Sequence, residues 1–274
     1  MAEPDGQFDR VITYLTHRFK KESYKKFLDF VEIIKVNQIP NGSIFSDAEI
    51  KQYIWKSIDD KKTTVLHLAA TMENSKVLEF LLKNTSNVEL NNSNEVTPLM
   101  LAIGSEDIEK VMMLTAHGGS PNNVDSEGNS PISSVILSEN IELLKYLLQN
   151  GLNPNLCYNE DSHSTLLHLA ARIGSIRQVR LLIEYNASYQ KQNTDGQAAI
   201  HLATMGDYAE IVEFLILSGD DMNRIDFEQL TPLNYAKLYG AIQVENLLHK
   251  KNASMRHDLW LEHDPSFKEF DGVE

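Results

Sequence analysis

The sequence has few of the residues on which metal sites, disulfides and membrane spans are built. Cysteine occurs once, at Cys157, so no internal disulfide can form and a reducing compartment is expected. No apolar run approaches the roughly 20 residues that a membrane helix needs. The first ten residues lack a basic segment followed by an apolar one, so no secretory signal is predicted. We therefore expect a cytoplasmic protein that binds no cofactor or metal and does not insert into membranes.

The charge of the chain excludes one class of partner. The net charge is −14 over 274 residues, and it is unevenly spread. The first 62 residues contain 11 basic and 10 acidic side chains, which leaves 14 basic and 29 acidic side chains for the rest. An acidic body repels phosphate backbones, which argues against nucleic-acid binding. It favours solubility and attracts basic partners.

An internal repeat organises most of the chain. Its segments begin at residues spaced by 33, 33, 35, 33 and 33. The six segments are Thr64–Ala70, Thr97–Ile103, Ser130–Ile136, Thr165–Ala171, Ala198–Thr204 and Thr231–Lys237.

Each segment has the features of a helix start. A Thr or Ser can cap the helix, and Pro98, Pro131 and Pro232 stand where a missing N–H is harmless. A second stretch with helical apolar spacing follows, and Gly- or Asn-rich turns end it. Asp125–Gly128 and Thr194–Gly196 indicate the tips of projecting hairpins. One helix pair cannot bury its apolar face alone, so the pairs are expected to stack.

The period and the T-P-L-H-x-A pattern resemble the ankyrin repeat. The resemblance implies an all-α solenoid of six helix–turn–helix repeats with hairpin fingers over residues 61–252. A helical N-terminal cap is expected over 1–60 and an acidic tail over 253–274. Members of this family bind other proteins, so the expected function is that of a scaffold or adaptor, not of an enzyme.

Three repeats depart from the pattern. Repeat three has Ser133 and Ser134 in place of His and Leu, and repeat five has Ala198 in place of the capping Thr. These repeats are expected to be locally weaker. The finger before repeat four, within Asn155–Ser164, is two residues longer than the others. The extra length either carries specific contacts or is slack.

The ends carry no repeat. Residues 11–19 and 27–36 have helical periodicity, and 47–58 is predicted to be a helix capped by Ser46 or Asp47. A cap is the main interpretation, although Ile39-Pro40 and Ile54-Trp55 faintly resemble an F-box. The alternative function is therefore a substrate receptor of a ubiquitin ligase that docks through these helices. The acidic tail is either frayed or a docking or export signal, as on ankyrin effectors of intracellular bacteria, which act in the host cytosol.

The histidines that recur in three of the repeats are expected to have a structural role. His67, His168 and His201 occupy the same place in their repeats, about one repeat apart, which is too far to share a metal ion. The ankyrin resemblance implies that each imidazole bonds between backbone turns and keeps adjacent repeats in register. Cys157 lacks a basic neighbour that would activate it, and His163 beside it is a weak signal. No catalytic set is predicted.

The resemblance places a partner in the concave groove formed by hairpin tips and first helices. The two residues after each segment should face it, and several are apolar where polar residues are typical. An exposed apolar stripe marks an interaction site, unless the side chains pack under the next repeat. The acidic finger tips, including Glu127 and Asp195, suggest a partner with apolar anchors and basic flanks. The predicted partner contacts are Met72, Leu137, Arg172, Ile173, Met205, Phe227, Glu228, Leu238 and Tyr239.

Two further expectations follow from the same register. Finger asparagines of ankyrin repeats can be hydroxylated, which implies Asn122 and Asn223 as sites here, with Asn155 displaced by the insertion. An aspartate at both Ile173 and Met205 is expected to meet water in the free chain and to abolish partner binding.

Overall fold

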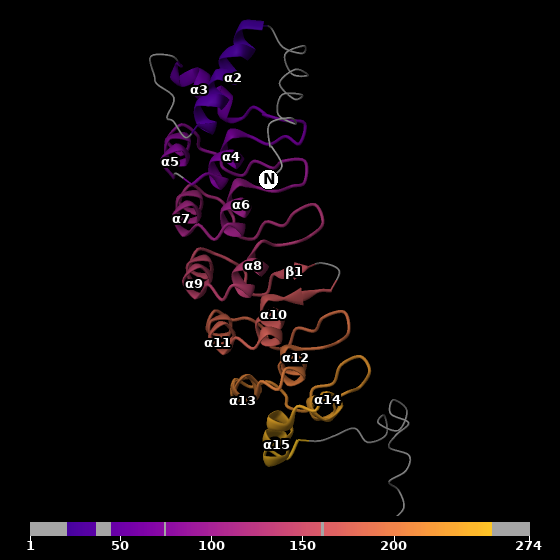
Figure 1. Cartoon of the computed structure of the whole chain (residues 1–274). Coiled ribbons are helices and arrows are strands. Elements are labelled where there is room, and N and C mark those ends of the chain that lie inside the picture. The colour runs from indigo at the N-terminus through magenta and orange to yellow at the C-terminus, as the bar shows by residue number, and fades with distance from the viewer. Residues whose placement is uncertain (1–20, 37–44, 74, 160–161, 254–274) are drawn as a thin grey trace, which may run out of the picture. The chain divides into compact units, whose positions relative to one another are not determined.

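The computed structural model describes residues 21–36, 45–73, 75–159 and 162–253. The chain divides into two compact units, residues 1–127 and 128–274, and each is described by itself. Each unit is built of helix pairs with a loop projecting beside them (Figure 1). In the described ranges, no helix is both long and apolar enough to cross a membrane.

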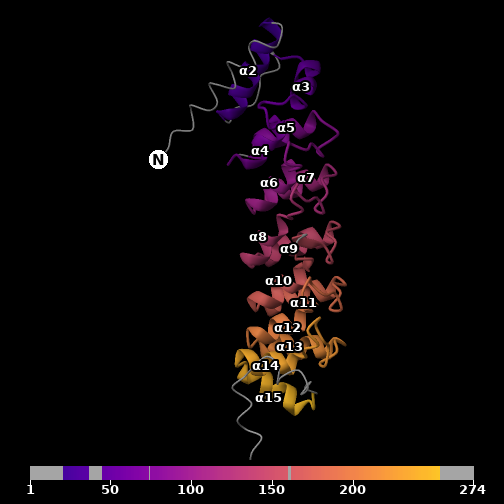
Figure 2. The same ribbon diagram turned by 90° about the vertical axis from the view of Figure 1, so that its right-hand side faces the viewer.

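Unit 1 holds the N-terminal helices and repeats one and two. First helices pack on first helices, α4 on α6, and second helices on second helices, α5 on α7. The same side-by-side order is visible from a second direction (Figure 2). The helices are α2 (Lys21–Lys35), α3 (Asp47–Ile54), α4 (Val65–Thr71), α5 (Ser75–Lys83), α6 (Pro98–Gly104) and α7 (Ile108–Ala116).

Unit 2 holds repeats three to six. Its first helices pack in the order α8, α10, α12, α14, and its second helices pack in the order α9, α11, α13, α15. The elements are α8 (Ile132–Leu137), α9 (Ile141–Gln149), β1 (Cys157–Asn159), β2 (Ser164–Thr165), α10 (Leu166–Ile173), α11 (Ile176–Glu184), α12 (Ala199–Met205), α13 (Ala209–Leu217), α14 (Pro232–Tyr239) and α15 (Ile242–Lys250).

The N-terminal helices cover repeat one. Both α2 and α3 pack on α4, and their aromatic rings form a cluster in which Phe30 lies 5.4 Å from Phe45 and 5.5 Å from Tyr53. Ser46 caps α3, because its Oγ accepts from the Glu49 N–H and Glu49 Oε2 accepts from the Ser46 N–H. The prediction that this helix continues to residue 58 was wrong. The chain leaves the helix at Trp55 and Ser57 bridges to Thr64.

Repeat six has the features of a terminal repeat of unit 2. In internal repeats, the fourth and eighth positions of the second helix are mostly apolar, as at Val212 and Ile216 of α13. In α15 these positions hold Glu245 and His249, and His249 Nε2 lies 3.5 Å from Glu245 Oε1. A solenoid needs a terminal repeat with a polar outer face, and α15 supplies one.

The longer finger of repeat four is a short hairpin. β1 and β2 pair antiparallel, with Cys157 opposite Thr165 and Asn159 opposite Ser164. A register shift lies between Cys157 and Asn159, so the inserted length is absorbed by an irregularity of the strand.

The motif histidines join each repeat to the next, as the resemblance implied. His67 Nδ1 accepts from the Thr64 backbone N–H at 3.2 Å, and its Nε2–H donates to the Val96 carbonyl of repeat two at 2.9 Å. His168 spans in the same way from Thr165 to Gln197. A neutral imidazole is the form that can accept at one nitrogen and donate at the other.

Repeat five keeps this arrangement without its Thr. The Ala198 backbone N–H donates to His201 Nδ1 at 3.1 Å, and His201 Nε2–H donates to the Arg224 carbonyl at 3.0 Å. In repeat three, the hydroxyls of Ser133 and Ser134 donate back to carbonyls of their own turn. The substitution in repeat five thus removes only the contact of a Thr hydroxyl with His Nδ1 that His67 and His168 have, and the substitutions in repeat three change the bonding partners. The expectation of lower local stability stays a prediction.

Burial lowers the pKa of all three histidines below the usual value of 6.5. A lowered pKa in the folded chain favours the neutral imidazole. The stability that this neutral form contributes is fully present above the unfolded pKa. It is lost as the pH falls below about 6.5, because the unfolded state then binds more protons.

We expect the His168→Asn variant to lose part of this pH dependence. Asn234 occupies the same place in repeat six, where its Oδ1 accepts from the Thr231 N–H at 3.0 Å, so asparagine fits the turn. Between pH 7.5 and pH 5.5, the unfolding free energy of the parent should fall by no more than about 1.4 kcal/mol per histidine per pH unit, and its melting temperature should fall with it. The variant should fall less steeply. Equal slopes for parent and variant in the same scanning calorimetry series would contradict this assignment.

Two glycines that cap the C-terminal ends of first helices provide a matched test of helix packing. Gly174 after α10 and Gly240 after α14 both have positive φ, at 82° and 67°. A Cβ at Gly174 would lie 2.5 Å from the Tyr208 ring, whereas nothing lies within 4 Å of a Cβ at Gly240.

We expect Gly240→Ala to cost only backbone strain, about 1–2 kcal/mol of unfolding free energy. Gly174→Ala should cost about 1–3 kcal/mol more, because the ring of Tyr208 must move from a packed position. Urea unfolding of both variants measures the difference. If the two variants unfold at the same midpoint, Tyr208 does not pack on Gly174 in solution.

Candidate functional site

In unit 2, the C-terminal ends of the first helices follow one another in a row. Each helix packs on the next, so the ends of α8, α10, α12 and α14 are neighbours in that order. We call this surface the helix-end row. Six of the predicted contacts lie on it, namely Leu137, Arg172, Ile173, Met205, Leu238 and Tyr239.

The row is only partly exposed. Leu137, Leu238 and Tyr239 expose 60%, 54% and 51% of their surface, and Arg172 is also exposed. Ile173 and Met205 are half-buried. An aspartate at either position would therefore be only partly exposed, and the expectation that it meets water in the free chain stays a prediction. Met72 is half-buried at the end of α4 and belongs to unit 1.

Tyr239 is held in place by a buried aromatic neighbour. Its ring stacks on Tyr235, with centroids 5.8 Å apart and planes inclined by 17°. The Tyr235 hydroxyl donates to Asp226 Oδ2 at 2.7 Å and accepts from Gln197 Nε2 at 2.9 Å. Burial raises the pKa of Tyr235, so its hydroxyl stays protonated and can donate. Tyr239 thus presents an exposed ring with little freedom to move.

The fingers are joined edge to edge by backbone hydrogen bonds. In each unit, one N–H of a finger donates to a carbonyl of the preceding finger, at 2.7–3.2 Å. The bonds in unit 1 run from Ser93 to Lys61 and from Ser126 to Asn94. Those in unit 2 run from Thr194 to Ser162 and from Phe227 to Asp195. The fingers are therefore fixed relative to their neighbours within each unit.

Phe227 lies at the last of these bonds and exposes 66% of its surface. Its ring rests on Gly196 of the preceding finger, where an added Cβ would come within 2.5 Å of the ring. Gly196 has φ +77°, which glycine adopts without strain. Phe227, like Tyr239, is thus an exposed aromatic side chain of which one side packs against the protein.

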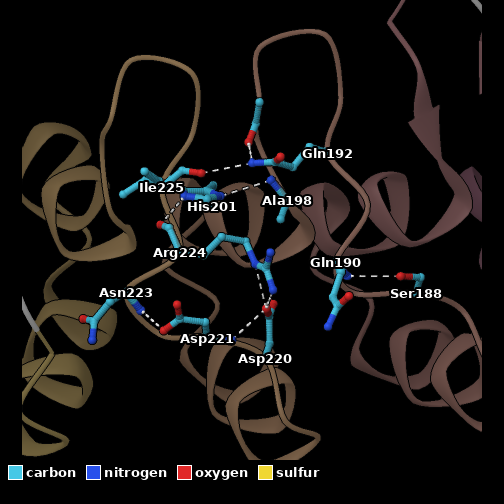
Figure 3. A network of polar contacts seen from close by, with 11 residues as sticks. Ser188, Gln190, Gln192, Ala198, His201, Asp220, Asp221, Asn223, Arg224 and Ile225 are labelled. Atoms are coloured by element: carbon cyan, nitrogen blue, oxygen red, sulfur yellow. Dashed lines mark hydrogen bonds and ion pairs between the residues drawn. The ribbon is translucent and has the colours of Figure 1, made fainter.

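A polar network supports the base of the repeat-six finger (Figure 3). Arg224 Nε and Nη2 lie 2.9 and 2.8 Å from Asp220 Oδ1, and Gln192 Nε2 donates to the Ile225 carbonyl at 3.0 Å. Burial raises the pKa of Asp220, and the adjacent Arg224 guanidinium opposes that shift. The finger base also borders an open pocket of about 660 Å³ that includes Gln192, Arg224 and Phe227 in its lining.

The finger tips of unit 2 are acidic, because Glu228 and Asp195 are exposed at the tips of repeats six and five. In unit 1, Glu127 is also exposed. Arg172 is the basic exception, and its Nη2 donates to the Tyr158 hydroxyl of the longer finger at 3.3 Å.

The two asparagines predicted to be hydroxylated occupy equivalent tight turns. The Asn122 N–H donates to Ser120 Oγ at 3.2 Å, and the Asn223 N–H donates to Asp221 Oδ1 at 2.9 Å. Both residues are half-buried. Asn155 of the longer finger instead bridges to repeat five, where its Oδ1 accepts from the Ser188 N–H at 2.7 Å. Hydroxylation of Asn122 and Asn223 stays a prediction.

Residues with catalytic or metal-binding potential are not brought together in the part of the chain that the structure describes. No group of three His, Cys, Asp or Glu there could hold a metal ion. Cys157 is half-buried in β1, and the motif histidines are buried with both ring nitrogens bonded to the backbone. The hydrogen bonds of these histidines join one repeat to the next.

The sequence analysis missed the residues that pack against the exposed rings of Phe227 and Tyr239 or connect their two repeats. Tyr235 replaces the usual Leu of the motif, and this departure was the signal that could have identified it. Gln197, Asp226 and Gln192 lie in finger positions that carry no motif, so only the structure reveals that they connect repeats five and six.

Comparisons with known proteins agree with this geometry. A family model of ankyrin repeats in three copies matches residues 66–158, 99–193, 132–226 and 167–258. The chain is 26% identical to an ankyrin repeat domain from Acinetobacter baumannii, with a TM-score of 0.63 over 69% of this chain and 98% of that one. The ankyrin repeat protein EF0377 is 27% identical, with a TM-score of 0.60 over 67% of this chain and 96% of that one.

Curated relatives are much longer proteins. Human SH3 and multiple ankyrin repeat domains protein 2 is 23% identical over 86% of this chain and 14% of its own length. The human transient receptor potential cation channel subfamily A member 1 is 29% identical over 69% of this chain and 21% of its own length. The chain thus spans at most about a fifth of these two relatives. The family model covers well over half of the chain, and the protein belongs to the ankyrin-repeat family.

Proposed function

We propose that this protein is a scaffold or adaptor that binds a partner protein through the helix-end row and the repeat-six finger of unit 2. Ankyrin repeats are in general non-catalytic protein-interaction modules. The observation that carries the proposal is that Phe227, Leu238 and Tyr239 are exposed within one repeat. The ring of Phe227 packs on Gly196, and the ring of Tyr239 stacks on Tyr235. Ordered aromatic side chains lose little entropy on binding and are enriched among the residues that dominate interfaces.

The chemistry of the partner follows from the surroundings of these anchors. Leu137, Ile173 and Met205 continue the apolar line from repeat six toward repeat three. Asp195 and Glu228 add negative charge at the finger tips. We infer a partner segment with apolar side chains for the row and basic residues for the finger tips, in keeping with the acidic body of the chain. A cytoplasmic location belongs to the same proposal.

The alternative, a ligase receptor that docks through the N-terminal helices, has less support. It needs residues 7–58 to stand apart with an exposed apolar face. In the described part of that segment, α2 and α3 pack on α4, and Phe27, Phe30 and Tyr53 are buried. These contacts favour a capping role. The origin of the chain as a bacterial effector stays a hypothesis.

The proposal predicts the effect of removing the two supported rings. Phe227→Ala with Tyr239→Ala should weaken partner binding by at least about 100-fold, because each central aromatic anchor contributes about 1.4 kcal/mol or more. Both rings are more than half exposed, so the melting temperature should change little. The partner is identified by affinity capture and mass spectrometry with the intact chain, and its affinity for each variant is then measured by calorimetry.

Leu217→Ala is the matched control. Leu217 exposes 74% of its surface at the end of α13, a second helix that does not contribute to the helix-end row. Binding should be unchanged in this variant. If the ring variant binds the partner as tightly as the parent, or if Leu217→Ala is equally damaging, the proposed surface is not the binding site.

A further inference from the structure

Unit 1 contains a second pocket, which is far in sequence from the exposed aromatic side chains Phe227 and Tyr239 of repeat six. It has a volume of about 360 Å³ and lies between the end of α3 and the turn after α5. The capping helices and repeat one thus each supply part of its wall. Its lining residues are Lys51, Trp55, Lys83, Asn84, Thr85 and Ser86.

The aromatic wall of the pocket is Trp55. Four aromatic residues in the described part of the cap face inward, and these residues, Phe27, Phe30, Phe45 and Tyr53, expose 2% or less of their surface. Trp55 follows directly on α3 and exposes 46%. Its indole is not needed to fill the aromatic cluster, and tryptophan is among the residues most enriched at binding surfaces.

The polar wall is cationic, although the chain as a whole is strongly acidic. Among the described residues that line the pocket, two of six are lysines and none is a carboxylate. Lys51 has no ion-pair partner among the described residues. Lys83 pairs with Glu79 at 2.7 Å, but the two side chains are 68% and 50% exposed, so a competing anion can replace that contact.

Hydrogen-bond donors complete the pocket. The exposed Ser86 has no hydrogen-bond partner within the described ranges, either for its hydroxyl or for its backbone N–H. The turn around it is fixed, because the Thr85 hydroxyl donates to the Asn87 carbonyl and the Asn87 N–H donates to Thr85 Oγ1. An anion between Lys51 and Ser86 would therefore meet an ammonium group and free donors beside an apolar ring.

We propose that this pocket binds an acidic segment of a partner protein, with a carboxylate between Lys51 and Ser86 and an adjacent aromatic side chain against Trp55. Charge complementarity carries the choice of occupant, since two lysines and no carboxylate are among the described residues that line the pocket. Phosphate groups are held best by the bidentate fork of arginine, and no arginine is among those described residues. A nucleic-acid chain would extend beyond the pocket over the acidic surface of a chain with net charge −14, whereas a short carboxylate segment need not.

The two tryptophans of the sequence make the site directly observable. Trp260 lies outside the described residues, and Trp260→Phe leaves Trp55 as the sole indole of the full chain. The probe is the peptide Gly-Glu-Asp-Phe-Glu-Asp-Phe-Gly, which has no tryptophan. Binding should shift the emission of Trp55 to shorter wavelength and protect the indole from acrylamide, because the aromatic side chain of the peptide excludes water from it.

Variants and peptides separate the elements of the proposal. Lys51→Glu in the same background should weaken binding of the peptide by at least about tenfold, which is the loss of one favourable charge contact and its reversal. Lys145→Glu, an identical charge change on an exposed lysine of α9, should leave the affinity within about twofold. A peptide with Gln and Asn in place of the acids should not bind.

Three results would overturn the proposal. The first is unchanged Trp55 fluorescence at millimolar acidic peptide. The second is equal affinity of the parent and Lys51→Glu when far-ultraviolet circular dichroism shows both to be folded. The third is a peptide with one phosphoserine that binds more than about tenfold tighter than the carboxylate peptide, which would assign the pocket to phosphorylated segments instead.

Discussion

The hydrogen bonds that run from one repeat to the next are the constraint on which this structure depends. A helix pair of this size buries too little apolar surface to be stable alone, so each repeat relies on its neighbour. The buried imidazoles supply directional bonds at this junction, as when His201 accepts from Ala198 and donates to the Arg224 carbonyl. The finger-to-finger bonds fix the same junction at its outer edge, as between Phe227 and Asp195. Together they set the register of stacking.

The binding proposal follows from that register. Because the repeats cannot slide past each other, the ends of the first helices in unit 2 form a fixed row, and each finger holds the next. Apolar side chains on such a platform can remain exposed without collapsing onto the core. Tyr239 on Tyr235 and Phe227 on Gly196 are examples in which such a contact orders an exposed side chain that the proposed partner would meet. The fold and the proposed function therefore rest on the same contacts.

The sequence predicted those features that a period and a motif encode. The six repeats and their helix starts follow from positions that recur along the chain, and the role of His67, His168 and His201 in joining repeats follows from the resemblance to the ankyrin repeat. Features that depend on a single repeat were not predictable. The repeat motif encodes neither the half-burial of Ile173 and Met205 nor the early end of α3, after which Ser57 bridges to Thr64. The Trp55 pocket arises where the non-repeating cap meets repeat one, and no motif describes that junction.

The central claim is that the fingers are fixed by their mutual backbone bonds and so present a rigid surface. Hydrogen–deuterium exchange of the intact chain tests this claim most directly. The backbone N–H groups of Ser93, Ser126, Thr194 and Phe227 each donate to the preceding finger, and they should exchange slowly, as helix amides do. The reference is the exchange rate that an unfolded chain of the same sequence shows under the same conditions. Exchange of all four amides at that rate would contradict the account.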